Sequence, residues 1–462
     1  MRILIIGGGA AGATAAQFAR KQNRDAEIII FEATQYSQYS KCGLPYALSG
    51  KIVAFENLVE FSQEWFQRNK IELRLSTTVE RIDSSRKTIT IRGPSGTQDE
   101  LYDALIFATG ASPSVPPIVG IHSGDRLRDG VFQFRDMNQA KEFKDWCLKK
   151  SRNVVVIGAG LVGLECAEAL HEMRRQVTVV EYLDSILPTM IDPDMTDQLL
   201  AIMSNVGIAV KISSSVEEVI GHPSIEGVMV TSRKDGKRDI VQCDTIILAA
   251  GQKPMTSLAQ QVGCDLGKAG HIIVNDRCET TVKGIFAIGD CSQYRDAVTK
   301  TELPVGLGTL AVKMGEIAGK NVAGGDSRLP AGFLNARVTR LFGIEIAAVG
   351  PLSSALTTAG INTIQSRVKG STLPDYYPGG KEITVKLSAS TDDGKIISCQ
   401  IVGEKESGLR IDVIAALMMG NLDVRSLSLL ETAYAPSVAP CVDVLTTAAQ
   451  AILIKLDRTK RE

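Results

Sequence analysis

The stretch RILIIGGGAAGATAAQFARK, residues 2–21, decides the fold of this chain. It opens as an apolar strand, and three glycines in the pattern GxGxxG, Gly7, Gly9 and Gly12, lead directly into a helical run. Glycine permits a tight turn and lets a pyrophosphate approach the backbone, while the helix N-terminus supplies amide donors. The stretch therefore predicts the first turn of a dinucleotide-binding fold.

A second apolar strand, AEIIIFE, ends in Glu32, which stands twenty residues beyond Gly12. A carboxylate at that place can bind the hydroxyl pair of a ribose. GxGxxG alone is a weak indication, but here the strand, the spacing and the acid agree. We therefore expect a dinucleotide at the N-terminal end of the chain.

The same pattern returns in NVVVIGAGLVGLECAEAL, with glycines at Gly158, Gly160 and Gly163. The following strand, QVTVVE, ends in Glu181, eighteen residues beyond Gly163. Two dinucleotide sites in one chain indicate two nucleotides that exchange electrons, and a flavin with a nicotinamide is the natural pair.

Two later strands end in polar positions, at the edge where an open parallel sheet binds ligands. YDALIFATGASP leads into Thr109 and Gly110, and TVKGIFAIGDC leads into Asp290. With these motifs in this order, the chain resembles the pyridine nucleotide-disulfide oxidoreductase superfamily over nearly all of its 462 residues.

The resemblance implies that the first GxGxxG binds FAD, with Glu32 on the ribose and Asp290 on the ribityl chain. It places Thr109 and Gly110 at the crossover to the nicotinamide domain. The segment AAGQKP, which contains Gly251, looks like the matching return crossover.

The expected fold class is α/β, with two Rossmann-like dinucleotide-binding domains, one inserted in the other, and a C-terminal α+β dimerisation domain. A length of 462 residues suits about three domains. We expect the FAD domain in two parts, at residues 1–112 and 250–325. The NAD(P)H domain is expected between them at 113–249, and the interface domain follows at 326–462.

The nicotinamide site is expected to prefer NADH. By resemblance Glu165 lies beside the nicotinamide, and the Glu181 carboxylate should repel the 2′-phosphate of NADPH. NADPH stays possible if Lys211, Arg233 or Lys234 folds back towards the ribose.

A lone cysteine, Cys42, stands in SKCGLPYALSG. Disulfide reductases with paired thiols carry a second cysteine five residues on, where this chain has Ala47. CGLPY instead resembles the single-cysteine branch of coenzyme A disulfide reductases, NADH oxidases, NADH peroxidases and NAD(P)H polysulfide or persulfide reductases. The resemblance implies that Cys42 cycles through a mixed disulfide, a persulfide or a sulfenic acid, as a thiolate favoured by a helix N-terminus and a flavin.

The neighbouring motifs narrow the acceptor in part. Ala10 replaces the histidine of the peroxidases, and Tyr434 in YAPSVAPCVDVL resembles the segment that reaches the partner subunit's cysteine and could donate a proton. For coenzyme A, the helix after the flavin turn keeps Arg20 and Lys21 but has Gln17 where an arginine is common. Coenzyme A is therefore possible as a substrate or an adduct.

Composition excludes several other classes. Lysine and arginine number 51 and aspartate and glutamate 52, so no net field favours nucleic acid or a membrane surface. The apolar runs fall far short of the roughly 20 residues that span a bilayer, and the N-terminus lacks the apolar region of a signal peptide, so we expect a cytoplasmic protein. Nine dispersed cysteines without a CxxC pair favour neither a disulfide framework nor a metal site.

The leading hypothesis is a homodimeric FAD-dependent NADH oxidoreductase that reduces a low-molecular-weight disulfide, persulfide or polysulfide of the coenzyme A disulfide type. Two alternatives stay open. One is an NADH oxidase that reduces oxygen through a sulfenic acid at Cys42, and the other is a flavin and NAD binding redox sensor or carrier-protein reductase, in which Cys42 would be dispensable.

Overall fold

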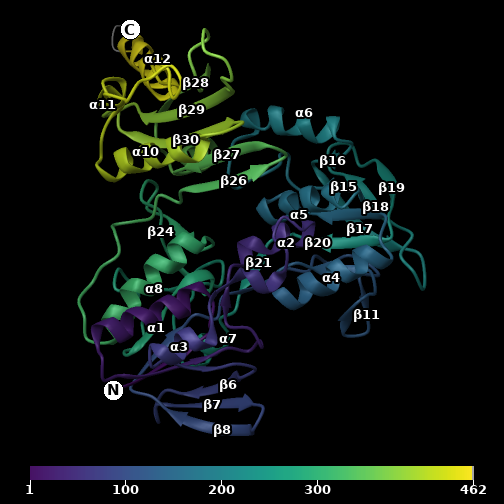
Figure 1. Cartoon of the computed structure of the whole chain (residues 1–462), viewed down its shortest axis with the longest axis vertical. Coiled ribbons are helices and arrows are strands. Elements are labelled where there is room, and N and C mark those ends of the chain that lie inside the picture. The colour runs from purple at the N-terminus through teal and green to yellow at the C-terminus, as the bar shows by residue number, and fades with distance from the viewer. Residues whose placement is uncertain (460–462) are drawn as a thin grey trace.

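A computed structural model of the protein describes residues 1–459. The chain forms three domains around three five-stranded sheets, with the N-terminus in the lower part of the molecule and the last described helix, α12 (Val444–Thr459), in the upper part (Figure 1). The first sheet is parallel throughout and has the order β23-β9-β1-β2-β5. Its strands are β1 (Arg2–Ile6), β2 (Glu27–Phe31), β5 (Glu72–Arg74), β9 (Ala104–Phe107) and β23 (Ile285–Ala287).

Two helices pack closely over this first sheet. Helix α1 (Ala10–Gln22) lies against α8 (Gly308–Val322), and both are rich in small residues. A Cβ at Gly315 would lie 2.6 Å from the Ala11 carbonyl oxygen, so the two backbones meet at a distance that only glycine permits. Helix α8 follows the inserted domain, and the FAD-type fold is therefore completed by two distant parts of the sequence.

The second parallel sheet repeats the arrangement of the first, in the order β13-β20-β14-β15-β16. Helix α5 (Leu161–Glu172) follows its central strand as α1 follows β1, and α4 (Met137–Lys149) packs beside it. Its strands are β13 (Val131–Gln133), β14 (Asn153–Ile157), β15 (Gln176–Val180), β16 (Ala209–Lys211) and β20 (Thr245–Leu248). The internal repeat in the sequence is thus a repeat of structure.

Each dinucleotide fold also contains a three-stranded antiparallel sheet. Along the chain, this sheet comes just before β9 in the first fold and just before β20 in the second. The first of these sheets contains β6 (Thr78–Asp83), β7 (Thr88–Gly93) and β8 (Gly96–Leu101). The second contains β17 (Ser214–Ile220), β18 (Gly227–Ser232) and β19 (Arg238–Gln242).

A short antiparallel ribbon joins the two dinucleotide folds. Strand β10 (Ala111–Pro113) pairs with β21 (Gln252–Pro254), so the chain leaves the first domain and returns to it at the same place. The Thr109 hydroxyl donates to the Met255 carbonyl at 2.6 Å, and the Met255 amide donates to the Gly110 carbonyl at 2.9 Å. Gly251, with φ +89°, accepts a bond from the Ser114 amide.

The C-terminal domain is an antiparallel sheet in the order β26-β27-β30-β29-β28, with α10 (Ser407–Met419) and α12 (Val444–Thr459) packed on it. Its strands are β26 (Arg337–Leu341), β27 (Ile344–Val349), β28 (Thr363–Ser371), β29 (Glu382–Ser390) and β30 (Ile396–Gly403). Side chains of β26, β27 and β30 share one hydrophobic core with α4 and α5 of the second dinucleotide fold.

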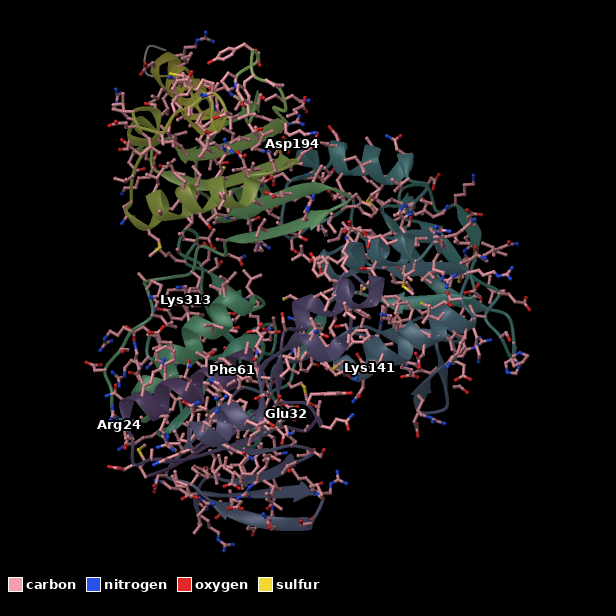
Figure 2. All side chains as sticks on the ribbon, viewed as in Figure 1. Arg24, Glu32, Phe61, Lys141, Asp194 and Lys313 are labelled. Atoms are coloured by element: carbon pink, nitrogen blue, oxygen red, sulfur yellow. The ribbon has the colours of Figure 1, made fainter. Side chains whose placement is uncertain are left out.

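A buried ion pair also ties the C-terminal domain to the second fold. The Lys386 ammonium on β29 lies 2.9 Å from the Asp192 carboxylate and 2.7 Å from Asp194, and Figure 2 shows Asp194 at the boundary between the two domains. Ser353 donates a further hydrogen bond to Asp192 at 2.5 Å. The interface domain is therefore held at a fixed place beside the second fold.

These sheets confirm the expected fold class of two related α/β domains, one inserted in the other, with an α+β domain after them. Within residues 1–459, no helix combines the length and the apolar character that crossing a bilayer requires.

Candidate functional site

The first glycine turn is shaped to leave the start of α1 open. Gly7 has φ +108°, and a Cβ there would lie 2.2 Å from the Ala108 carbonyl oxygen. A Cβ at Gly12 would lie 2.0 Å from the Gly7 carbonyl oxygen, so the helix packs directly on the turn. A Cβ at Gly9, by contrast, would meet no protein atom within 4 Å. The open side of the turn is therefore the side from which a phosphate can reach the helix N-terminus.

Glu32 closes the same turn from the end of β2. Its carboxylate accepts hydrogen bonds from the Gly8 and Thr34 amides, both at 2.8 Å. Figure 2 places Glu32 near the middle of the molecule, on the side of the first domain that faces the second. The carboxylate is thus fixed where the sequence predicts a ribose.

The second turn repeats this geometry. Gly158 has φ +108°, a Cβ at Gly163 would lie 2.0 Å from the Gly158 carbonyl oxygen, and a Cβ at Gly160 would meet nothing within 4 Å. The Glu181 carboxylate accepts from the Ala159 amide at 2.6 Å and from the Leu183 amide at 2.8 Å. The chain therefore has two matched dinucleotide cradles.

Asp290 lies where the sequence predicts it, at the end of β23, and it has a partner that sequence analysis missed. The Arg135 guanidinium, which precedes α4 in the inserted domain, donates to the Asp290 carboxylate at 2.5 Å. The buried Arg135 Nε has no hydrogen-bond partner among the described residues. The two residues are 155 positions apart, and no sequence motif marks Arg135.

Cys42 lies in a short turn, Lys41–Gly43, immediately before helix α2 (Leu44–Ser49). Its thiol is free and exposed, whereas seven of the other eight cysteines are buried. The surrounding protein nevertheless desolvates the sulfur and raises the pKa of Cys42, and the carboxylates of Glu165 and Asp290 raise it further. The expected thiolate depends on a helix N-terminus together with a flavin, and the protein's own groups act in the opposite direction, chiefly through desolvation of the sulfur.

Glu165 lies on α5, five residues after Gly160. Burial raises the pKa of its carboxyl group, although a hydrogen bond from the Thr339 hydroxyl at 2.9 Å lowers it. Thr339 belongs to β26, so the C-terminal domain reaches the helix of the second cradle. No sequence motif indicated this contact.

Tyr434 does not join Cys42 within one chain. Its side chain is 48% exposed, and its hydroxyl lies 2.8 Å from that of Tyr376, an exposed residue between β28 and β29 that sequence analysis missed. Exposed apolar side chains surround the segment, including Leu429, Val438 and Val442. This face is the kind of surface that a second subunit covers.

The Arg20 side chain binds backbone carbonyls of its own chain and is not free for the expected phosphate contact. Its guanidinium donates to the backbone carbonyls of Arg24 and Lys70 at 2.6 Å each and to that of Asn69 at 3.2 Å. The charge thus ties α1 to the start of β5, and only Lys21 stays on the helix surface, over the Phe18 ring.

Both cradles fit dinucleotides on the geometry of the protein itself. Each leaves a helix N-terminus open, places a carboxylate at the neighbouring strand end and has no side chain in front of the second glycine. The buried Arg135 Nε, on the guanidinium that pairs with Asp290, is left without a partner, as a group that binds a polar ligand would be. In residues 1–459 no group of three histidine, cysteine or acidic side chains is arranged to hold a metal ion.

Comparison with known proteins agrees with this geometry. The family described as pyridine nucleotide-disulphide oxidoreductase matches residues 1–312, and its dimerisation domain matches residues 338–444. An NADH oxidase of Methanocaldococcus jannaschii is 35% identical over 99% of both chains. A CoA-dependent NAD(P)H sulfur oxidoreductase of Pyrococcus abyssi is 32% identical over 97% of this chain and 98% of its own.

Among solved structures, an NAD-dependent persulfide reductase from A. fulgidus superposes with a TM-score of 0.93 at 31% identity, covering 99% of this chain and 84% of its own. The family and the two cradles together support a flavin and a nicotinamide dinucleotide as the ligands. The expected family is thereby confirmed: the chain is an oxidoreductase and belongs to the pyridine nucleotide-disulphide oxidoreductase family.

Proposed function

We propose that this protein uses NADH and FAD to reduce a low-molecular-weight disulfide, persulfide or polysulfide, with Cys42 as its single redox-active cysteine. One observation carries the proposal. Cys42 alone among the nine cysteines is both exposed and placed between the two dinucleotide cradles, within electrostatic reach of Glu165 and Asp290.

The chain's own residues divide the work of binding. The open turn at Gly9 would take the pyrophosphate of FAD, Glu32 its ribose, and Asp290, held by Arg135, its ribityl chain. Bound FAD would supply the hydride acceptor between NADH and the sulfur. Gly160 and Glu181 would hold NADH in the same way on the second cradle, with Glu165 beside the nicotinamide.

Cys42 would carry the sulfur chemistry. Its thiolate attacks one sulfur of the substrate, so that a mixed disulfide forms, the substrate S–S bond breaks and one thiolate leaves. Two electrons from NADH, transferred through bound FAD, would then cleave the mixed disulfide, which restores the Cys42 thiolate and releases the second thiol. Tyr434 of the partner subunit is the proposed proton donor to the leaving thiolate, which makes the homodimer, expected in the cytoplasm, the working unit.

NADH is the proposed nucleotide. Lys211 pairs with Asp239 at 3.0 Å, and Arg233 stacks on the Tyr182 ring at 3.8 Å, so neither positive charge neutralises the Glu181 carboxylate. Arg233 nevertheless stays close to Glu181, because it stacks on Tyr182, the next residue in the chain. The geometry therefore also fits the use of NADPH at lower efficiency.

The names of the relatives support sulfur as the acceptor, since two of the three compared are named for sulfur or persulfide reduction. Coenzyme A is proposed as one possible carrier of that sulfur. Because Arg20 is hydrogen-bonded to backbone carbonyls, the phosphates of coenzyme A would need other partners.

The relative named NADH oxidase supports oxygen as a second candidate acceptor. Mass analysis of the purified protein separates the two, because coenzyme A, an extra sulfur and an oxygen on Cys42 differ in mass. Steady NADH consumption under air without a disulfide would favour the oxidase.

The deciding experiment is Cys42→Ser. The variant should keep FAD and should still pass electrons from NADH to ferricyanide, because the residues proposed to bind both nucleotides are unchanged. Reduction of coenzyme A disulfide and polysulfide should fall by orders of magnitude, since serine cannot form the mixed disulfide. Reduction of sulfur substrates at the wild-type rate would replace the proposal with a reductase that does not use Cys42.

A further inference from the structure

Reduction of a disulfide by NADH takes up one proton from solvent, because NADH and one proton together convert RSSR into two RSH and NAD⁺. If oxygen is the acceptor, NADH, one proton and O₂ give H₂O₂ and NAD⁺, so a proton is again taken up. No histidine is proposed as the proton donor to the Cys42 site. The proposed donor, Tyr434, would come from the other subunit. The route of the proton within one chain is therefore an open chemical question.

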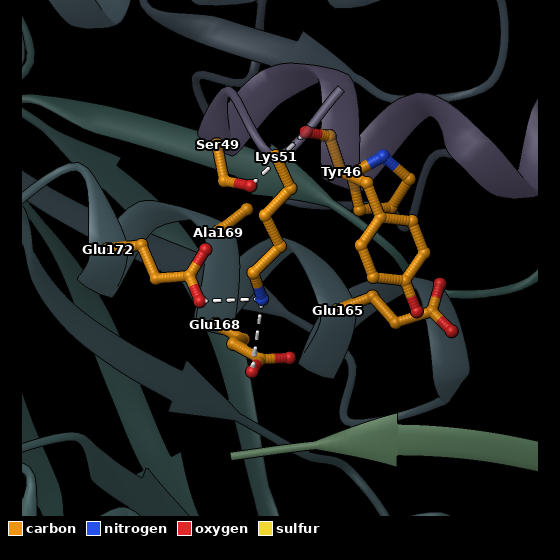
Figure 3. A pocket seen from close by; sticks show the side chains of 8 residues that line it. Tyr46, Ser49, Lys51, Glu165, Glu168, Ala169 and Glu172 are labelled. Carbon is orange, nitrogen blue, oxygen red and sulfur yellow. Dashed lines mark hydrogen bonds and ion pairs between the residues drawn. The ribbon is translucent and has the colours of Figure 1, made fainter. Parts of the chain in front are cut away.

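A face between α2 and α5 carries a row of titratable side chains that leads away from Cys42. Glu165, Glu168 and Glu172 lie three and seven positions apart on α5, so they share one side of the helix. Together with Tyr46 and Lys51 they line a small cavity between the two helices (Figure 3). The cavity has room for about one water molecule.

The outer end of this row is open to solvent. The Lys51 ammonium lies 2.6 Å from the Glu172 carboxylate and 3.7 Å from that of Glu168, and the Lys51 side chain is 47% exposed. The Glu168 carboxylate accepts a hydrogen bond from the Phe342 amide at 3.1 Å, which fixes it towards the cavity. Burial raises the pKa of Glu168, so its carboxyl group can hold a proton at a higher pH than an exposed glutamate.

The inner end of the row is Tyr46, which stands four residues after Cys42 on the same short helical segment. Figure 3 shows its hydroxyl on the Glu165 side of the cavity. Burial raises the pKa of the phenol, and the carboxylates of Glu165 and Glu168 and the Cys42 thiol all act on it. The phenol is therefore within electrostatic reach of both the buried carboxyl groups and the sulfur.

We propose that Glu168, one water molecule in the α2–α5 cavity and the Tyr46 phenol form the path by which the proton consumed in each turnover travels from solvent to the Cys42 site. The inference rests on the proposed function for its acceptor. A phenol and a carboxyl group can each accept a proton on one side and release one on the other, and a single water is enough to join them.

The titratable groups that line the path come from the α2 segment and from α5. Cys42 lies in the turn before α2, Tyr46 on α2 and Lys51 just after it, and α5 supplies the three glutamates. The described contacts from β26 and the turn after it are neutral, namely the Thr339 hydroxyl and the Phe342 amide. Farther from the cavity, Asp290, Arg135 and Glu60 also act on the Cys42 thiol.

The main test is Glu168→Gln, which keeps the size of the side chain and an acceptor for the Phe342 amide but cannot release a proton. We expect kcat with coenzyme A disulfide to fall about tenfold or more, with an unchanged KM and a larger solvent deuterium isotope effect on kcat. Ferricyanide turnover should not change, because NADH and two ferricyanide ions give NAD⁺ and release a proton instead of consuming one. Tyr46→Phe should give the same pattern.

Glu172→Gln is the matched control, since it removes the charge from the shorter of the two contacts with Lys51 but lies at the solvent end. The variant should keep the wild-type turnover rates with coenzyme A disulfide and with ferricyanide, and the wild-type solvent isotope effect. A structural role for the Lys51 ion pairs predicts the opposite order, with the Glu172 variant affected at least as much as the Glu168 variant.

The proton path is overturned if Glu168→Gln leaves the isotope effect unchanged, if it slows ferricyanide as much as the disulfide, or if the Glu172 variant matches it. If the Glu168 variant does not fold, the same comparison is made with Tyr46→Phe. If the wild-type protein reduces oxygen and not disulfides, the proposed function fails, and the comparison is then made with oxygen, which also consumes a proton.

Discussion

Replacement of Gly9 by alanine separates what the first glycine turn does for folding from what it does for binding. Gly9 caps α1 with φ −69°, a value that alanine adopts freely, and the added Cβ would meet no protein atom within 4 Å. The stability of the apoprotein should therefore fall by no more than about 1 kcal/mol, the scale of an N-cap change.

The same methyl group would stand in front of the helix N-terminus, where a bound pyrophosphate needs close approach. Overpacking of one methyl costs about 1–3 kcal/mol. Since about 1.4 kcal/mol is a tenfold change, the Kd for FAD should rise about 5- to 150-fold.

The assay is titration of the apoprotein with FAD, followed by flavin fluorescence, beside thermal unfolding of both apoproteins. Gly160→Ala makes the same change in the second cradle, where the Cβ is equally free, and should raise KM for NADH with no loss of FAD. Gly12→Ala should instead destabilise the apoprotein, because its Cβ would lie 2.0 Å from the Gly7 carbonyl oxygen. Wild-type FAD affinity in the Gly9 variant, or loss of NADH binding in place of FAD binding, would refute the reasoning.

Three further predictions concern specificity, stability and the partner subunit. Glu181→Ala should raise kcat/KM with NADPH relative to NADH, and adding Arg233→Ala should reverse that gain; unchanged ratios in both would show that neither charge is felt by the 2′-phosphate. Lys386→Met leaves the buried Asp192 carboxylate without its ion pair and should lower the free energy of unfolding by about 3–5 kcal/mol at neutral pH. Burial raises the pKa of Asp192, but hydrogen bonds, that of Lys386 among them, hold it below 3.8, so the difference between wild type and variant is present above pH 3.8 and should shrink as the pH falls through the folded-state pKa. Tyr434→Phe should lower disulfide turnover about tenfold to a hundredfold with ferricyanide turnover unchanged; equal rates with the disulfide would leave the residue a packing role at the interface.

The sequence alone was sufficient for the parts of the molecule that are set within about thirty residues. Both glycine turns, their helices and the acids Glu32 and Glu181 lie where the spacing predicts them. The reason is local: the φ angle of a glycine, the close packing of the helix on the turn and the length of one strand–helix–strand unit fix these positions whatever the rest of the chain does.

Contacts between distant segments needed the tertiary structure. Arg135 meets Asp290 across 155 positions, and Thr339 meets Glu165 across 174, because the inserted domain packs on the first dinucleotide fold and the C-terminal domain packs on the inserted domain. Such contacts depend on how sheets and helices pack, and no spacing within the sequence marks either partner.

The chemistry of Cys42 divides in the same way. Its position at the start of a helix follows from its local sequence, CGLPY. The surroundings of its sulfur depend instead on the tertiary structure, because a local pattern includes only the helix that follows the cysteine. The folded chain adds desolvation, which raises the pKa of Cys42, and the carboxylates of Glu165 and Asp290, which come from two other elements and raise it further.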